Sequence, residues 1–243
     1  MHVHMPKPLH GWREFLNEIS VIVIGVLIAL ALEQGVSWLH DRASGAETRE
    51  GLRREIGDNL QFFARRLQTE ACVQGRLREI ATYLDAAQGG KPVPRPTWIG
   101  SPDDPIAGDS RFKSAQSAGK YSLLAQDEQL TFAVFHSDSS DFNDANTREL
   151  YDWAQLRSLT DPDTRLTETE ISRLRHALDD ARAADWVIQL DMAEYMKMAR
   201  DAKIVASNRV VGIVLAAPVC LPMDTPTAEA AAKSMTGAVA FPE

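Results

Sequence analysis

The longest uncharged stretch of the chain covers residues 19–32, where only Ser20 and Gly25 interrupt strongly apolar residues. At about 1.5 Å per residue it gives about 21 Å of helix, less than the roughly 30 Å hydrocarbon layer of a bilayer. Apolar residues on both flanks lengthen it to residues 15–39, or roughly 37 Å of helix. The pattern therefore predicts a transmembrane helix over residues 15–39 that follows a tail over residues 1–14.

Two tryptophans bracket the predicted span. Trp12 and Trp38 lie about 39 Å apart along a helix, which is close to the distance between the two interfaces of a membrane. Tryptophan is enriched at these interfaces because its ring is apolar and its indole N–H donates a hydrogen bond. We expect Trp12 and Trp38 to be membrane-interface anchors.

One face of the predicted span carries small and acidic residues. At 100° per residue, Gly25 and Ala29 lie on the same side of the helix as Glu18 and Glu33. A pair of small residues four positions apart lets two membrane helices approach closely, and glutamates beside it avoid lipid by facing a partner. Alternatively, the glutamates lie at the headgroup level and the small pair has no partner.

A cleaved signal peptide is the competing explanation of this stretch. Ala29 and Ala31 have the small-x-small spacing of a cleavage site. The preceding segment, however, carries Glu14 and Glu18 and is not the cleanly positive leader of a signal peptide. An uncleaved anchor is therefore favoured.

The orientation of the span rests on opposing arguments. Arg42 and Arg49 are among the cations that follow the span, and a bare count of charges slightly favours a cytoplasmic C-terminal side. Large domains, however, translocate largely regardless of charge, and a disulfide would require an oxidising compartment. We expect the N-terminus in the cytoplasm and the main domain in the periplasm, anchored to a bacterial inner membrane.

The remaining chain has the pattern of an all-α domain over residues 45–217. After a polar neck over residues 41–48, apolar residues recur at steps of three and four and predict a helix over about residues 47–88. It should end where Gly89 and Gly90 meet a proline-rich run, and a break near Gly75 is an open alternative.

A second long helix begins at a capping box formed by Thr167 and Glu170. Mostly apolar residues recur at alternating steps of three and four without interruption from Ile171 to Ala202, a seam typical of coiled-coil packing. Its length matches the first long helix, so we expect an antiparallel helical bundle with these two helices as its spine. Asp185 lies in the seam and needs a partner, for which an arginine across the bundle is the natural choice.

Shorter elements connect the two long helices. Residues 89–120 hold five prolines and predict a long crossover loop, pinned to the bundle by Trp98. Two helices are expected next, over residues 123–135 and 144–159, separated by a polar turn over residues 137–141.

The C-terminal part and the cysteines leave alternatives open. The apolar run over residues 210–221 contains Pro218 and is too short to span a bilayer, so we expect a buried end of the bundle. Cys72 and Cys220 either form one disulfide, which would close a loop of well over 100 residues, or are two unpaired apolar side chains. A tail is predicted over residues 218–243.

Charge and motifs exclude several functions. The net charge of −8, without a cluster of Lys and Arg alone, argues against nucleic-acid binding. The sequence contains no nucleophile elbow, phosphate-binding glycine loop, His-Glu-x-x-His or Cys-x-x-Cys motif. Asp138, Asp141 and Asp144 crowd one segment but lack the spacing of a calcium loop. We therefore predict no catalytic residue, no cofactor and no metal.

Residues 12–19, 23–30 and 49–56 resemble an uncharacterised bacterial family. Its members join one N-terminal membrane helix to a helical domain of unknown function. Cys72 and residues 115–119 are similar to scattered features of the same family, whereas residues 33–36 depart from it. The resemblance implies a membrane-anchored helical architecture and brings no assigned activity.

Two functions remain compatible with the sequence. The first is a non-catalytic protein that binds a protein partner or a second copy of itself at the inner membrane. The second is an extracytoplasmic ligand-sensing or accessory domain that signals through a partner, with residues 91–120 covering a pocket. A pocket with converging charges under that loop favours sensing, whereas a filled core beside an exposed apolar stripe favours a protein partner.

Overall fold

The protein is described here by a computed structural model, which covers residues 11–207 and 218–225. Within these residues the chain is all-helical, as predicted. The expectations for residues 1–10, 208–217 and 226–243 lie outside the described part. The elements in chain order are α1 (Trp12–Gln88), α2 (Ser110–Ser117), η1 (Lys120–Leu123), α3 (Gln126–Leu156), η2 (Arg157–Thr160), α4 (Glu168–Asp201) and η4 (Pro218–Cys220).

Helix α1 joins the predicted span and the first long helix into one uninterrupted helix of 77 residues. The polar neck over residues 41–48 is helical, and no break occurs at Gly75. No proline lies between Trp12 and Gln88, and a helical glycine costs only about 1 kcal/mol relative to alanine. The helix ends at Gly89, as expected, and Gly90 follows in a left-handed conformation with φ of 66°.

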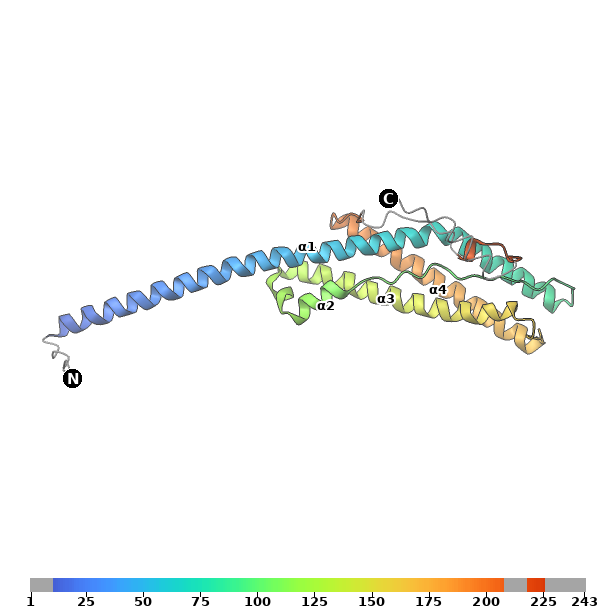
Figure 1. Cartoon of the computed structure of the whole chain (residues 1–243), viewed down its shortest axis with the longest axis horizontal. Coiled ribbons are helices and arrows are strands. Elements are labelled where there is room, and N and C mark those ends of the chain that lie inside the picture. Colours follow the sequence, from blue (N-terminus) through green and yellow to red (C-terminus); the bar gives the residue numbers. More distant parts are fainter. Residues whose placement is uncertain (1–10, 208–217, 226–243) are drawn as a thin grey trace, which may run out of the picture.

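The N-terminal half of α1 projects away from the rest of the chain (Figure 1). Every described side chain from Gly11 to Ala43 is exposed, and burial begins at Ser44. The most apolar 18-residue window of this helix has a mean hydropathy of 2.4, and none of it is buried. By length and composition, α1 is the one helix in the described part of the chain that could cross a membrane.

Helix α3 corrects the prediction of two helices separated by a turn. Residues 137–141 are helical, and α3 continues through them from Gln126 to Leu156. Phe135, Ser139 and Phe142 are all buried, at steps of four and three. The Ser139 hydroxyl donates a hydrogen bond to the Phe135 carbonyl at 2.9 Å, within the helix. The polar composition of residues 137–141, which is typical of turns, therefore led to a wrong prediction although their buried positions have the spacing of a helix.

Helix α4 begins at the predicted cap, because the Thr167 hydroxyl accepts a hydrogen bond from the Glu170 amide at 3.2 Å. It runs opposite to α1. Arg53, in the early turns of the buried part of α1, donates to the Lys203 carbonyl beyond the end of α4 at 2.6 Å. Arg175, near the start of α4, pairs with Asp85 near the end of α1 at 2.6 Å.

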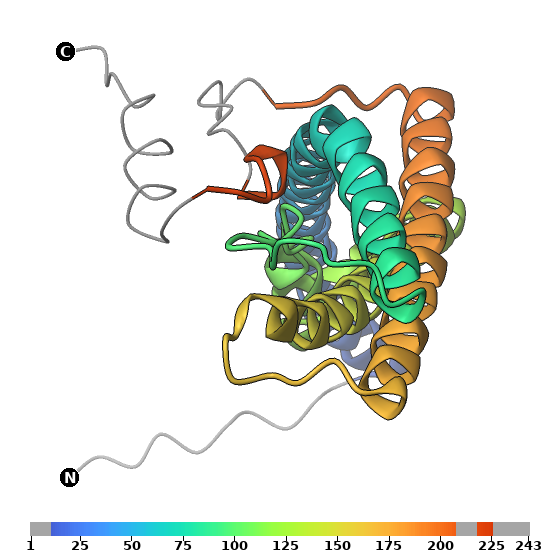
Figure 2. The same ribbon diagram turned by 90° about the vertical axis from the view of Figure 1, so that its right-hand side faces the viewer.

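Helix α3, in contrast, runs in the same direction as α1. Arg49 pairs with Glu128 near the start of α3, and Arg66 pairs with Glu149 further along both helices. Figures 1 and 2 show the buried part of α1 beside α3 and α4. The chain must return along the bundle between α1 and α3, which explains the length of the connection over residues 89–125.

The core consists of two apolar clusters along the bundle. One contains Phe63 and Tyr195, and the other contains Leu77 and Trp153. Charged residues occupy the helix positions between the two clusters, including Arg66, which is fully buried.

Candidate functional site

The connection after α1 lies against the bundle as an extended strap over residues 91–109. The Asn59 side chain binds the backbone of Gly108 in both directions, accepting from its amide at 2.7 Å and donating to its carbonyl at 3.0 Å. Asn143 makes the same two-way contact with Ala107, at 2.8 and 3.0 Å. Side chains from two helices therefore fix this part of the strap by its backbone.

The space beneath the strap is almost filled. A cavity of about 10 Å³ lies between Asn59, Gly108, Phe112, His136 and Tyr195, with room for about one water molecule. Pockets for small organic ligands are about 300–1,000 Å³. This cavity does not provide the pocket that a ligand-sensing function needs.

A larger hollow of about 310 Å³ opens between α1 and α2. Its lining includes Glu47, Gly51, Arg111 and Lys120. The guanidinium of Arg111 is already paired with Asp58 at 3.0 Å. This hollow lies at the lower end of the size range of small-ligand pockets.

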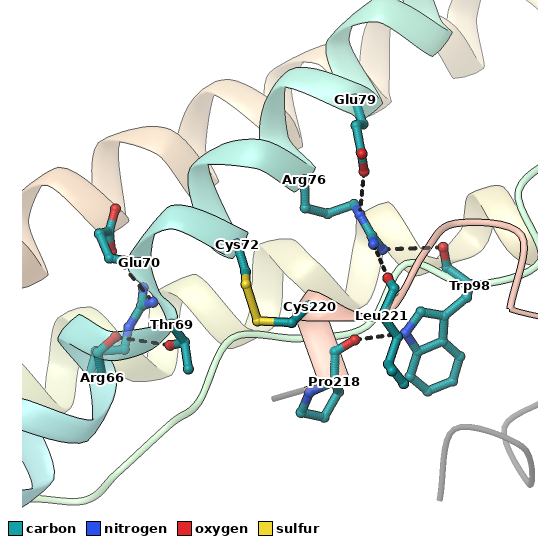
Figure 3. The surroundings of a disulfide bond; sticks show 10 residues. All are labelled: Arg66, Thr69, Glu70, Cys72, Arg76, Glu79, Trp98, Pro218, Cys220 and Leu221. Carbon is teal, nitrogen blue, oxygen red and sulfur yellow. Dashed lines mark hydrogen bonds and ion pairs between the residues drawn. A yellow bond between two sulfur atoms is a disulfide. The ribbon is translucent and has the colours of Figure 1, made fainter. Parts of the chain in front are cut away.

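A disulfide joins Cys72 of α1 to Cys220 of η4, with the sulfur atoms 2.06 Å and the Cα atoms 5.0 Å apart (Figure 3). Arg76, one turn further along α1, donates to the carbonyls of Ile99 and Leu221. The Trp98 indole donates to the Pro218 carbonyl at 2.7 Å. The disulfide and these hydrogen bonds attach both the strap and the segment around η4 to the same side of α1.

Glycine is required where the strap meets this segment. Gly100 has φ of 76°, and a Cβ atom built on it would lie 2.4 Å from the Pro218 carbonyl oxygen. A side chain at this position would separate the two segments.

A buried charge network crosses the middle of the bundle. Arg66 donates to Glu149 at 2.8 Å and to Asp185 at 2.7 Å, and all three side chains have zero exposure. Glu70 lies 3.6 Å from Arg66, at its Nη1 atom. Burial and the neighbouring carboxylates raise the pKa of Glu149 to about 8, against the opposing effect of Arg66. The predicted arginine partner of Asp185 is confirmed as Arg66.

The sequence reasoning missed Glu149, although its position offered a signal. It falls at a step of three or four from Ala145, Asn146, Asp152 and Trp153, which are all buried. Helical period alone therefore places this carboxylate in the core of α3.

A groove of about 580 Å³ lies between α3 and α4, and no residue of α1 lines it. Its lining combines small apolar residues with carboxylates. The lining residues are Ala145, Thr147, Arg148, Tyr151, Asp152, Asp180, Ala183, Ala184 and Val187. We call it the α3–α4 groove; sequence reasoning did not find it, because it depends on how two helices pack.

Asp152 and Asp180 belong to the lining at one end of this groove, whereas Asp141 and Asp191 lie about one helical turn beyond the lining at the other end. Burial and the charges of Glu194, Asp141 and Asp191 raise the pKa of Asp138 to about 6. Burial and the charge of Asp180 raise the pKa of Asp152 at the other end. Burial is the larger cause of both shifts, and the charges of the neighbouring carboxylates add to it.

The predicted residues of the membrane helix all lie on the exposed half of α1. Trp12 is 73% and Trp38 57% exposed, and the Arg42 guanidinium lies 5.3 Å from the Trp38 ring centre. A Cβ atom built on Gly25 would meet nothing within 4 Å. Glu18, Ala29 and Glu33 share this exposed stretch, and no other part of the described chain covers it.

No group of three or more His, Cys, Asp or Glu residues in the described part of the chain is placed to hold a metal ion. His136 stacks on Phe112 with ring centres 4.2 Å apart, which is a packing contact.

Comparison with protein-family models, curated proteins and solved structures finds no match to this chain. The family resemblance of residues 12–56 therefore stays an expectation.

Proposed function

We propose that this chain is a single-pass membrane protein that acts without catalysis, by binding another protein at the inner membrane of a bacterium. One observation carries the proposal: the described chain leaves apolar surface uncovered in two places, along residues 15–39 of α1, which fit a membrane, and in the α3–α4 groove of the bundle, which fits a protein partner. The filled space beneath the strap supports a protein partner over a small ligand.

The disulfide supports the proposed location of the domain. Disulfides persist in oxidising compartments and are rare in the cytosol. The pair Cys72 and Cys220 therefore supports a periplasmic domain, with the N-terminus in the cytoplasm. In this arrangement the bundle begins only a few residues after the span, so its partner lies near the membrane surface.

We also propose that the anchor contributes to binding through its face of small residues. Gly25 and Ala29 would let a second membrane helix approach closely, and Glu18 and Glu33 would face the same partner. The absence of contacts around Gly25 within the described chain leaves this face open for a partner.

The test uses the full chain in its native membranes. After cross-linking and purification in mild detergent, we expect one envelope protein, or a second copy of the chain, at a fixed ratio. Gly25→Leu should reduce the captured amount several-fold, whereas Ala31→Leu, a similar enlargement on another face of the span, should not. A chain that purifies alone after cross-linking would contradict the proposal.

Ligand sensing is the second candidate, and it rests on the 310 Å³ hollow beside α2. A small periplasmic ligand should then raise the melting temperature of the full chain, and Lys120→Ala should abolish that shift. Without such a shift across a metabolite panel, the hollow has no sensing role.

A further inference from the structure

The two ends of the α3–α4 groove repeat one spacing on both helices. Asp141 and Asp152 are eleven residues apart on α3, and Asp180 and Asp191 are eleven apart on α4. Eleven residues make about three turns of helix, so each pair lies on one face with about 17 Å between its members. Carboxylates about three turns apart on each helix therefore bracket the groove, whose lining lies within residues 145–152 of α3 and 180–187 of α4.

The walls between these ends are apolar and small. Ala145 on α3 and Ala183, Ala184 and Val187 on α4 line the groove together with the ring of Tyr151. Small side chains let the backbone of a neighbouring helix approach closely. An extended segment would bury unpaired backbone groups against these apolar walls, whereas a helix satisfies its own hydrogen bonds.

The charge of the groove is strongly unbalanced. Among the described residues, Asp138, Asp141, Asp191 and Glu194 form no ion pair with a cation. Arg148 is the one basic residue in the lining, and its charge only partly offsets the rise in the pKa of Asp191 that burial, Asp141 and Glu194 cause. The Asp191 Oδ2 atom is buried and has no hydrogen-bond partner in the described chain. A cationic group placed here would relieve the repulsion among the carboxylates and give that atom a donor.

We propose that the α3–α4 groove binds a cationic amphipathic helix of a partner protein. The helix carries an apolar face about three turns long and Lys or Arg residues about eleven positions apart, which meet the carboxylates at the two ends. This inference rests on the proposed function and names the chemistry of its partner. Docking would place a fourth helix against the bundle, opposite α1.

The first test uses the disulfide-bonded full chain in nanodiscs of zwitterionic lipid, with empty nanodiscs as the blank. The probe is a labelled 18-residue helix-forming peptide with a Leu and Ala face and two Lys residues eleven positions apart. We expect saturable binding by fluorescence anisotropy that weakens as salt rises. Equal binding of the same peptide with Glu in place of Lys would overturn the inference.

Substitutions in the full chain test whether the peptide binds in the α3–α4 groove. Asp141→Asn with Asp191→Asn should weaken binding about tenfold, whereas Asp127→Asn with Asp201→Asn, carboxylates at the helix ends, should not change it. Ala184→Phe should abolish binding by filling the groove, and the matched Ala193→Phe should not, because nine residues place Ala193 on the opposite side of α4. Melting temperatures identify any variant that fails to fold, and equal effects of both phenylalanines would overturn the inference.

A second test separates this inference from the proposed function. Photo-cross-linking residues are placed at Ala184, at Ala193 or at Gly25 of the full chain in native membranes, and the captured peptides are sequenced. A cationic amphipathic helix captured at Ala184 and not at Ala193 supports the groove. Capture at Gly25 alone would overturn the groove and leave the proposed function standing, whereas capture at none of the three would overturn both.

Discussion

The guanidinium of Arg66 faces carboxylates from three helices, Glu70 on α1, Glu149 on α3 and Asp185 on α4. Glu149 and Asp185 are fully buried with Arg66, whereas Glu70 is partly exposed. Burial first, and then the charges of Asp185 and Glu70, raise the pKa of Glu149 to about 8 against the opposing charge of Arg66, so that this residue holds a proton at neutral pH. Burial and the charge of Asp185 also raise the pKa of Glu70.

Glu149 should make the stability of the protein fall as pH rises. Its pKa is about 8 in the folded protein and 4.5 ordinarily, so between these values the folded protein holds a proton that the unfolded chain has released. The free energy of unfolding is therefore highest below pH 4.5 for this group and declines towards pH 8. Glu149→Gln, which mimics the protonated form, should reduce the decline by on the order of 3 kcal/mol.

Urea unfolding of both proteins at pH 5, 6.5 and 8 measures this effect. Part of the decline should persist in the variant, because Glu70 also has a raised pKa. Glu168→Gln, an exposed carboxylate at the start of α4, is the control and should leave the profile unchanged. Parallel profiles for wild type and Glu149→Gln would show that Glu149 is ionised in the folded protein.

Two helical glycines of α1 should respond in opposite directions to the same substitution. A Cβ atom on Gly57 would lie 2.8 Å from the Val205 carbonyl oxygen, and the Gly57 carbonyl accepts a hydrogen bond from the Ser207 amide. A Cβ atom on Gly75 would meet nothing within 4 Å. Gly75→Ala should raise the free energy of unfolding by about 0.5–1 kcal/mol, the usual gain in a helix, whereas Gly57→Ala should lower it.

Thermal unfolding of Gly75→Ala, Gly57→Ala and the wild type measures these changes in stability. A higher melting temperature for Gly57→Ala would mean that the segment around Val205 does not pack on α1 as described.

At the scale of elements, the sequence predicted regular apolar seams well and connections poorly. The first and last long helices followed from steps of three and four and from the Thr167 cap. The middle of α3 did not, because Ser139 packs in the core through hydrogen bonds and not through apolar contact. Trp98 was expected to pin the strap, and its indole does bind the segment around η4. The α3–α4 groove and the hold of Asn59 and Asn143 on the strap escaped prediction, since both depend on side chains from elements far apart in sequence.

The disulfide between α1 and η4 should contribute strongly to stability. It joins residues 148 positions apart, so it removes much of the freedom of the unfolded chain. Cys72→Ser should lower the free energy of unfolding by about 2–5 kcal/mol, and chain-entropy arguments place a loop of this size near the upper value. Denaturant unfolding with and without reductant measures it.

Cys220→Ser and the double variant serve as controls for the disulfide. Both should match Cys72→Ser, and reductant should change none of the three. Insensitivity of the wild type to reductant, with complete reduction verified by thiol labelling, would contradict a stabilising role for this bond.

At the scale of the whole molecule, one helix belongs to two environments. Residues 15–39 of α1 are apolar and exposed, whereas from Ser44 onward the same helix supplies a buried face to the bundle. Because α1 is continuous, a tilt or rotation of its N-terminal half would be transmitted to the bundle without an intervening joint.

The bundle should fold without the exposed half of α1. A chain that lacks residues 1–39 loses no described side chain that is buried, because burial begins at Ser44. We expect it to remain in solution without detergent and to keep the helical circular dichroism of the bundle. It should melt within about 3 °C of the full chain, because a change below about 1 kcal/mol moves the melting temperature of a domain of this size by only a few degrees. Removal of residues 1–50 is the matched control: it also deletes Ser44, Thr48 and the Arg49 partner of Glu128, and it should lower the melting temperature further. Equal destabilisation by both deletions would mean that the apolar half of α1 packs on the bundle instead of leaving it for a membrane.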